Sequence, residues 1–156
     1  QVVLASFMLN ILIWAIFLIP AFYFSELTPW ANKATQLMTL SSLVHVLATS
    51  ALVLLLANIF PTTKAMNFFG TLFSVVISFA TGVFIDRSLL WEPLLEVSRI
   101  TPSYWDVSNL EYIFESSRLA NYDLSPYYFN LLVMVLMTVA ALLATVIWRR
   151  IRKQEA

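Results

Sequence analysis

The feature that most constrains this chain is a set of four long stretches that carry no charged side chain. Each exceeds the roughly 20 residues that an α-helix needs to cross the hydrocarbon layer of a bilayer. Lipid cannot hydrogen-bond to exposed backbone groups, so a crossing segment must satisfy its own N–H and C=O groups as a helix. The sequence therefore predicts an all-α, polytopic membrane helix bundle of four spans, at residues 2–24, 36–60, 65–85 and 126–148.

The overall composition supports a membrane location. Of 156 residues, 60% are hydrophobic and 12% are charged, and the mean hydropathy is +0.82. A soluble domain has about 25% charged residues, and a chain of this size cannot bury so much apolar surface in one core. We therefore interpret residues 1–156 as a single transmembrane domain.

Residue counts exclude several classes of function. The net charge is zero, which gives no general attraction to nucleic acid. The chain has no cysteine and one histidine, so disulfides, thiolate metal sites and histidine-rich metal sites are excluded. We expect no metal, no cofactor and no catalytic residue, because the sole imidazole, His45, lies within a span and cannot serve a Ser-His-Asp triad at the wet face.

Basic residues after the last span predict the orientation. Arg149, Arg150, Arg152 and Lys153 follow this span directly, and short flanks rich in Lys and Arg stay on the cytoplasmic side. Four spans then place both termini in the cytoplasm and residues 86–123 outside it. We expect an integral protein of the bacterial inner membrane.

The predicted external segment, residues 86–123, is too long for a simple connection. Its apolar and charged side chains follow the pattern of two amphipathic helices that lie on the membrane surface. The second helix is expected to begin at Ser108, where Ser108 and Glu111 form a Ser-x-x-Glu capping box. Ser125 is expected to cap the last span ahead of Pro126.

Carboxylates and arginines of the external segment are expected at the depth of lipid headgroups. Such groups bind the amines and phosphates of phospholipids. Two other interpretations stay open: the surface helices simply cover the bundle, with their carboxylates forming a solvated face, or they dock another chain. The lipid hypothesis assigns the contact to Arg99, Glu111, Glu115, Ser116 and Arg118.

A row of polar side chains follows the second span at helical spacing. Ser41, His45 and Thr49 are four residues apart and should form a ridge that faces other helices. The simplest interpretation is a neutral His45 imidazole that hydrogen-bonds to a hydroxyl or a carbonyl across a helix interface. A proton relay, a quinone contact or a single axial ligand are the alternatives. No second acid or base within the spans is available to complete a relay, unless Asp86 at the end of the third span reaches inward.

Four short motifs occur in an order that resembles a known family. They are the sequences at residues 84–86, 111–116, 123–126 and 148–150. This layout resembles the membrane domain of the bacterial lipid A phosphoethanolamine transferases and of related sulfatase-like inner-membrane proteins of the alkaline-phosphatase superfamily. The resemblance implies that the chain is the membrane domain of such a protein, or a stand-alone relative, without the zinc-dependent catalytic domain.

The resemblance also bears on lipid contact. The transferases carry an Asn, a Thr and a Glu near the lipid headgroup, and the matching places here are Tyr112, Ser116 and Ala120. On this basis Tyr112 joins the expected lipid-contacting residues, although only the hydroxyl at Ser116 keeps the chemistry of the family.

The sequence favours one function and leaves a second open. The first is a non-catalytic integral membrane module that anchors or partners an extracytoplasmic activity and contacts phospholipid headgroups. Its expected partners are membrane lipids and either other membrane chains or an extracytoplasmic domain that is absent from this sequence. The alternative is a small accessory subunit of a multi-subunit respiratory, photosynthetic or transport complex.

Overall fold

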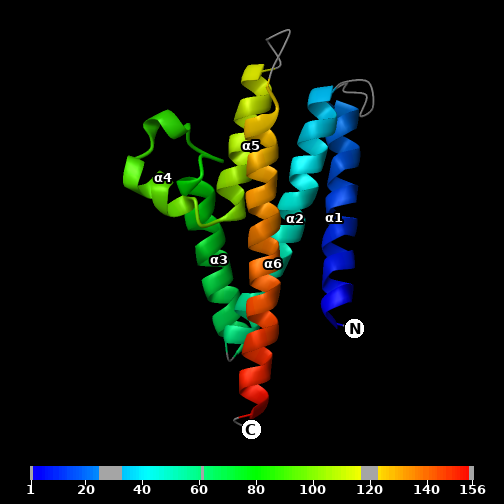
Figure 1. Cartoon of the computed structure of the whole chain (residues 1–156), viewed down its shortest axis with the longest axis vertical. Helices are drawn as coiled ribbons and strands as arrows, with labels where there is room; N and C mark the ends of the chain where they lie inside the picture. The colour runs from blue at the N-terminus through cyan, green and yellow to red at the C-terminus, as the bar shows by residue number, and fades with distance from the viewer. Residues whose placement is uncertain (1, 25–32, 61, 117–122, 155–156) are drawn as a thin grey trace.

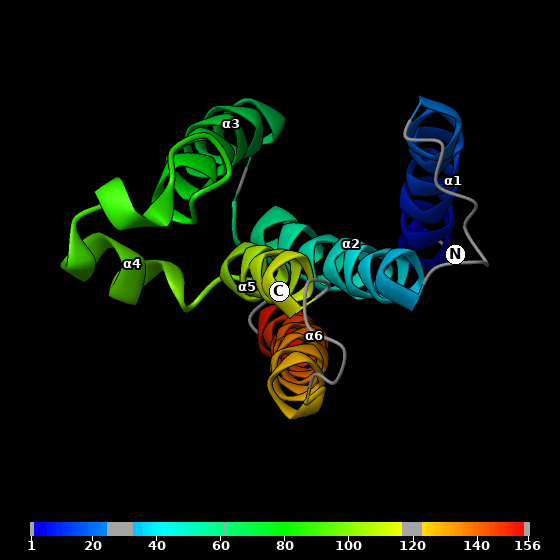
Figure 2. The same ribbon diagram turned by 90° about the horizontal axis from the view of Figure 1, so that it is seen from above.

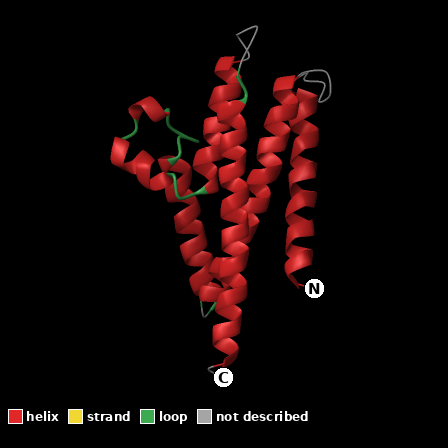
Figure 3. Cartoon of the chain, viewed as in Figure 1, coloured by secondary structure: helices red, strands yellow, loops and turns green. Residues whose placement is uncertain are grey.

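The protein is described by a computed structural model, which covers residues 2–24, 33–60, 62–116 and 123–154. Across these residues the chain is helical and forms no strand (Figure 3). Its elements, in chain order, are α1 (Val2–Phe24), α2 (Lys33–Ile59), α3 (Thr63–Ala80), the 3-10 turn η1 (Arg87–Leu89), α4 (Glu92–Ser98), α5 (Pro102–Ser116) and α6 (Ser125–Gln154).

Helix α2 is the centre of the arrangement. It packs against α1, α3, α5 and α6, and α5 also packs against α6 (Figure 1, Figure 2). The bundle has two ends, named here by residues of α6. At the Ser125 end, α2 and α6 begin; at the Gln154 end, α6 finishes and α2 connects to α3 (Figure 1).

Three helices are long and apolar enough to cross a membrane: α2, α3 and α6. The described apolar part of α1, Leu4–Pro20, is shorter. Few side chains of these helices are buried, and many large apolar ones are exposed, as expected when lipid is the solvent. The predicted helical membrane bundle is confirmed, whereas the expected four spans correspond to three such helices and one shorter apolar helix.

The buried core lies where α2, α5 and α6 meet. Leu37, Ile113, Tyr127, Leu131 and Met134 form its apolar cluster. The Tyr127 hydroxyl is buried there and donates a hydrogen bond to the Leu37 carbonyl, 2.8 Å away. The core therefore joins three elements that are far apart in sequence.

Helix α5 packs within the bundle, whereas the sequence predicts an amphipathic helix on its surface. It packs against both α2 and α6, and Asn109 and Ile113 on its inner face are buried. Pro102, its first residue, lines the same groove as Thr49 of α2, about 24 Å along α2 from Lys33 at a rise of 1.5 Å per residue. The helix thus extends from the interior of the bundle to the Ser125 end (Figure 1).

The predicted start of α5 is wrong, and α6 begins at Ser125 as predicted but with a different capping group. Helix α5 begins at Pro102, so Ser108 lies within it and does not cap it; the Ser108 hydroxyl donates to the Tyr104 carbonyl one turn earlier. At α6 the capping oxygen belongs to Asp123, which accepts from the N–H and the hydroxyl of Ser125. These hydrogen bonds lower the pKa of Asp123.

Candidate functional site

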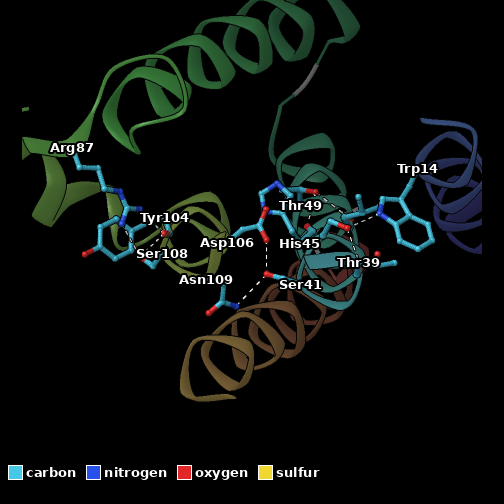
Figure 4. A network of polar contacts seen from close by, with 12 residues as sticks. Trp14, Thr39, Ser41, His45, Thr49, Arg87, Tyr104, Asp106, Ser108 and Asn109 are labelled. Atoms are coloured by element: carbon cyan, nitrogen blue, oxygen red, sulfur yellow. Dashed lines mark hydrogen bonds and ion pairs between the residues drawn. The ribbon is translucent and has the colours of Figure 1, made fainter. Parts of the chain in front are cut away.

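The polar face of α2 points into the bundle toward α5 (Figure 4). Ser41 is fully buried, and its hydroxyl donates to Oδ1 of Asp106 at 2.6 Å. A hydrogen bond to a carboxylate in a region of low polarity is stronger than one between neutral groups. This contact therefore holds α5 against α2.

The network continues from α5 to α6 through two amides. Asn109, which is fully buried, donates from Nδ2 to the Ser41 hydroxyl at 3.1 Å. Asn130 of α6 donates from its own Nδ2 to Oδ1 of Asn109 at 2.9 Å. One connected set of hydrogen bonds thus links α2, α5 and α6, so each member depends on the others for a partner.

His45 lies beside the same carboxylate. Its Nδ1 is 3.8 Å from Oδ2 of Asp106, and both side chains are largely buried. Within the described part of the chain, His45 Nδ1 is buried and has no hydrogen-bond partner. A proton added to Nδ1 would convert this contact into an ion pair between α2 and α5.

The expected polar ridge on α2 serves two different neighbours. Ser41 and His45 face α5, as described above. Thr49 donates back to the His45 carbonyl at 2.9 Å within α2, and it lines the groove between α2 and α3. The three residues therefore do not act on one common partner.

A second polar cluster joins the end of α3 to α5 through one arginine. The Arg87 guanidinium stacks over the Tyr104 ring, with its central carbon 4.4 Å from the ring centroid. It donates to the carbonyls of Thr81 and Tyr104 at 2.8 and 2.7 Å, and to Ser108 Oγ and Glu111 Oε2 at 2.8 and 2.9 Å. We call these five residues the Arg87 clamp, because they tie the turn after α3 to the outer face of α5.

Glycine at position 82 makes room for the Arg87 clamp. Gly82 has a φ of +91°, a conformation that residues with a Cβ rarely adopt. A Cβ placed there would lie 2.5 Å from Cγ of Arg87. The turn and the arginine therefore fit together only because this residue has no side chain.

Burial and charge act in opposite directions on Glu111. Burial raises its pKa above the ordinary 4.5, and the neighbouring Arg87 lowers it by charge and hydrogen bonding, but the effect of burial is larger. The side chain is 47% exposed, so the ion pair is screened by solvent and adds little stability. Its role in the clamp is chiefly geometric.

The structure does not gather the residues expected to contact lipid. Arg99 pairs with Glu96 at 2.9 Å near the start of α5, whereas Glu115 lies exposed near the end of that helix, about 20 Å away along its axis. Glu111 belongs to the Arg87 clamp, and the Tyr112 hydroxyl donates to the Asp123 carbonyl. The Ser116 side chain and Arg118 lie outside the described residues.

Sequence reasoning missed Asp106, Asn109 and Asn130. Asp106 and Asn109 lie in the predicted external segment, residues 86–123, for which the sequence predicts no burial against α2. Asn109 and Ile113 lie three and seven residues after Asp106, so all three share one face of a helix. This spacing could have predicted that the two polar residues lie on the same side as an apolar one. Asp86, the acid that a relay through His45 would require to reach inward, caps η1 by accepting from Ser88 N–H.

No group of three or more His, Asp or Glu side chains in the described part of the chain could hold a metal ion. The network can make and break hydrogen bonds between α2, α5 and α6.

One comparison with known proteins gives a match. A family model described as ABC-2 type transporter matches residues 2–115. No curated protein and no solved structure matches the chain. The resemblance to the phosphoethanolamine transferases and sulfatase-like proteins is therefore wrong. Its motifs record membrane helices, a helical insert and an arginine-rich flank, and unrelated helical membrane proteins share these features.

Proposed function

Because the chain belongs to the ABC-2 type transporter family, we propose that it forms part of the membrane pathway of a transporter and acts together with other chains of that transporter. The observation that carries this proposal is the family match over residues 2–115, which includes α1 to α4 and nearly all of α5. It favours the transport-complex alternative drawn from the sequence over a module that anchors an extracytoplasmic activity.

The network around Ser41 and Asp106 supports a mechanical role for α5 within such a pathway. A buried set of hydrogen bonds between α2 and α5 has two discrete states, made or broken, and such contacts suit an element that changes position during transport. We assign to Ser41, Asp106 and Asn109 the task of holding α5 in the position seen here. His45 adds a second contact between the same two helices, with its Nδ1 3.8 Å from Oδ2 of Asp106.

The orientation belongs to the same proposal. Arg149, Arg150 and Arg152 at the Gln154 end favour the cytoplasmic side for that end, and we place both termini there, in the inner membrane of a bacterium. The Ser125 end, with the tips of α5 and α6, then faces away from the cytoplasm.

Lipid contact remains a proposal for the Ser125 end. The exposed Glu115 is available to a headgroup amine. Arg99 and Glu111 already pair with groups of this chain, which weakens their part in the proposal. Headgroup contact is therefore secondary to transport as a function.

Co-purification tests the proposed function. The tagged chain is extracted from native membranes with a mild detergent, and bound proteins are identified and quantified by mass spectrometry. We expect an ATP-hydrolysing transporter chain in fixed stoichiometry. A chain recovered alone, or together with respiratory or photosynthetic subunits, would contradict the proposal.

A matched pair of variants makes the co-purification test specific. Asp106→Ala breaks the network and should lower transport while the partner is still recovered, because Asp106 lies inside the bundle. Glu115→Ala removes an exposed carboxylate of the same helix and should leave transport unchanged.

A further inference from the structure

The facing sides of α2 and α3 enclose a groove that takes no part in the polar network. The two helices join at the Gln154 end and diverge toward the Ser125 end (Figure 1). Thr101, Pro102 and Ser103, where α5 begins, close the wide end of the groove. The groove is partly open to the surroundings, and the space within it has a volume of about 180 Å³. We call this space the α2–α3 groove.

The lining of the α2–α3 groove changes from apolar to hydroxyl-bearing along its length. Leu56 and Met66 lie nearest the connection between the two helices, at the narrow end. Ser74, Ser78 and Ser103 lie toward the wide end. None of the described side chains that line the groove is charged. The lining of the groove therefore suits an uncharged amphiphile.

Three hydroxyl groups are free to bind a ligand. Thr49 and Thr101 also line the groove, but their hydroxyls donate to the carbonyls of His45 and Ser98. In the part of the chain that the structure describes, the Ser74, Ser78 and Ser103 side chains make no hydrogen bond. A hydroxyl that faces lipid without a partner is unfavourable, so a polar ligand group there would be stabilised.

Gly70 widens the middle of the α2–α3 groove. It lies in α3 between the apolar and the hydroxyl-bearing ends. An added Cβ would meet no atom within 4 Å. Space of this kind beside a helix backbone lets a chain of methylene groups approach closely.

We propose that the α2–α3 groove binds the acyl chain of an uncharged amphiphile, whose hydroxyl, ester or amide group lies against Ser74, Ser78 and Ser103. The apolar side chains bury the methylene groups, and the serine hydroxyls both donate to and accept from the polar group. A charged headgroup is disfavoured, since no side chain of opposite charge lines the groove. This inference rests on the proposed function, because membrane lipid reaches the groove only if α2 and α3 cross the bilayer.

Photolabelling tests the proposal on the intact transporter complex in phosphatidylcholine nanodiscs. The probe is a monopalmitoylglycerol with a diazirine in its acyl chain, and the labelled residues are located by mass spectrometry. Labels are expected on the narrow-end residues Leu56 and Met66. Diazirine-bearing palmitate and hexadecane, which carry a charge or no polar group, should label these residues less.

Three variants of α3 separate binding from folding. Gly70→Leu fills the groove and should abolish labelling, whereas Gly70→Ala adds one methyl group and should retain it. Thr71→Leu, one residue along and outside the lining, is the control for added bulk. Ser74→Ala with Ser78→Ala should weaken probe binding about fivefold for each hydroxyl, the size of one neutral hydrogen bond.

The labelling results either overturn the proposed acyl-chain site or identify the source of its ligand. Equal labelling of wild type and Gly70→Leu, or equal labelling by the hexadecane probe, would overturn the proposal even if the complex still co-purifies, so its failure is distinct from that of the proposed function. Labelling that changes when ATP is added supports a transported amphiphile as the ligand. Labelling that ignores ATP supports a resident lipid in the same groove.

Discussion

At the level of single residues, Asp106 ties α5 to α2 through its contacts with two side chains of α2. Its carboxylate accepts from Ser41 and lies beside His45. A buried carboxylate keeps a helix in place only while its donors are present, because losing them leaves an unpaired charge in a region of low polarity. The residue is therefore a sensitive point for mutation.

Removing the Asp106 carboxylate should destabilise the bundle. Asp106→Ala leaves the buried Ser41 hydroxyl without its acceptor, and we expect a loss of about 1–3 kcal/mol. Asp106→Asn keeps an acceptor oxygen and should lose less. Reversible unfolding in mixed micelles, followed by circular dichroism, measures both, with the exposed Glu115→Ala as control. Equal stability of Asp106→Ala and wild type would show that the contact carries no energy.

Glu111 should make stability depend weakly on pH. Because burial raises its pKa above 4.5, the folded protein binds this proton more tightly than the unfolded chain does. The stability that Glu111 contributes is thus fully present below pH 4.5 and is lost as the pH rises through the raised pKa. The free energy of unfolding of wild type should decrease relative to that of Glu111→Gln over that range. The decrease should be less than about 1 kcal/mol, because the group is half-exposed.

Unfolding curves of the Glu111 pair at several pH values measure this difference. Wild type and Glu111→Gln should converge toward a constant offset in acid. If the free energy of unfolding of wild type instead decreased relative to that of Glu111→Gln as the pH fell, the ion pair with Arg87 would outweigh the effect of burial.

The two glycines should respond in opposite ways to the same substitution. Gly82→Ala forces a left-handed residue to carry a Cβ against Arg87 and should cost about 1–3 kcal/mol. Gly70→Ala adds a methyl group in open space on a helix and should stabilise α3 by up to about 1 kcal/mol. Thermal unfolding of both variants provides the comparison. A stable Gly82→Ala protein would show that the turn can rearrange.

At the level of helices, the sequence predicted the long apolar elements and misplaced α5. Four uncharged runs can be recognised as membrane helices from length and composition alone, and α2, α3 and α6 fit that prediction. Helix α5 has a mixed sequence, and nothing local distinguishes a polar face toward water from a polar face toward Ser41. The answer lies on α2, which is distant in sequence.

Helix α3 shows a smaller departure from the sequence-based prediction. Its uncharged run continues to Ile85, but the helix ends at Ala80. Gly82 and the hydrogen bonds of Arg87 to Thr81 and α5 turn the chain before the apolar run is complete. A long-range contact therefore sets this helix end, which hydropathy alone cannot reveal.

Helix α1 should be the least protected of the long helices. None of its described side chains is buried, and Asn10 and Trp14 hydrogen-bond to Ser50 and Ser42 of α2 at 2.8 and 3.0 Å. Asn10→Leu with Trp14→Phe should speed amide exchange in α1 about threefold for each bond lost, the effect of roughly 0.6 kcal/mol. Hydrogen exchange by mass spectrometry should find α2 and α6 unchanged. Equal acceleration throughout would show that α1 stabilises the whole bundle.

At the level of the whole molecule, the two ends of the bundle should lie on opposite sides of the membrane. The chain has no cysteine, so single cysteines report position without background. Glu115→Cys, near the end of α5, should react with a membrane-impermeant maleimide in intact cells. Lys64→Cys, at the start of α3, should react only after lysis. Equal reactivity in intact cells would rule out the spanning arrangement.

The central position of α2 has a consequence for how the protein is made. Ser41 and its partner Asp106 are 65 residues apart, so ribosomes deliver α2 to the bilayer well before α5 exists. Until α5 is present, the Ser41 hydroxyl and the His45 imidazole of α2 need other hydrogen-bond partners, because lipid offers them none. Between the synthesis of α2 and that of α5, we therefore expect α2 to depend on the insertion machinery or on a neighbouring chain.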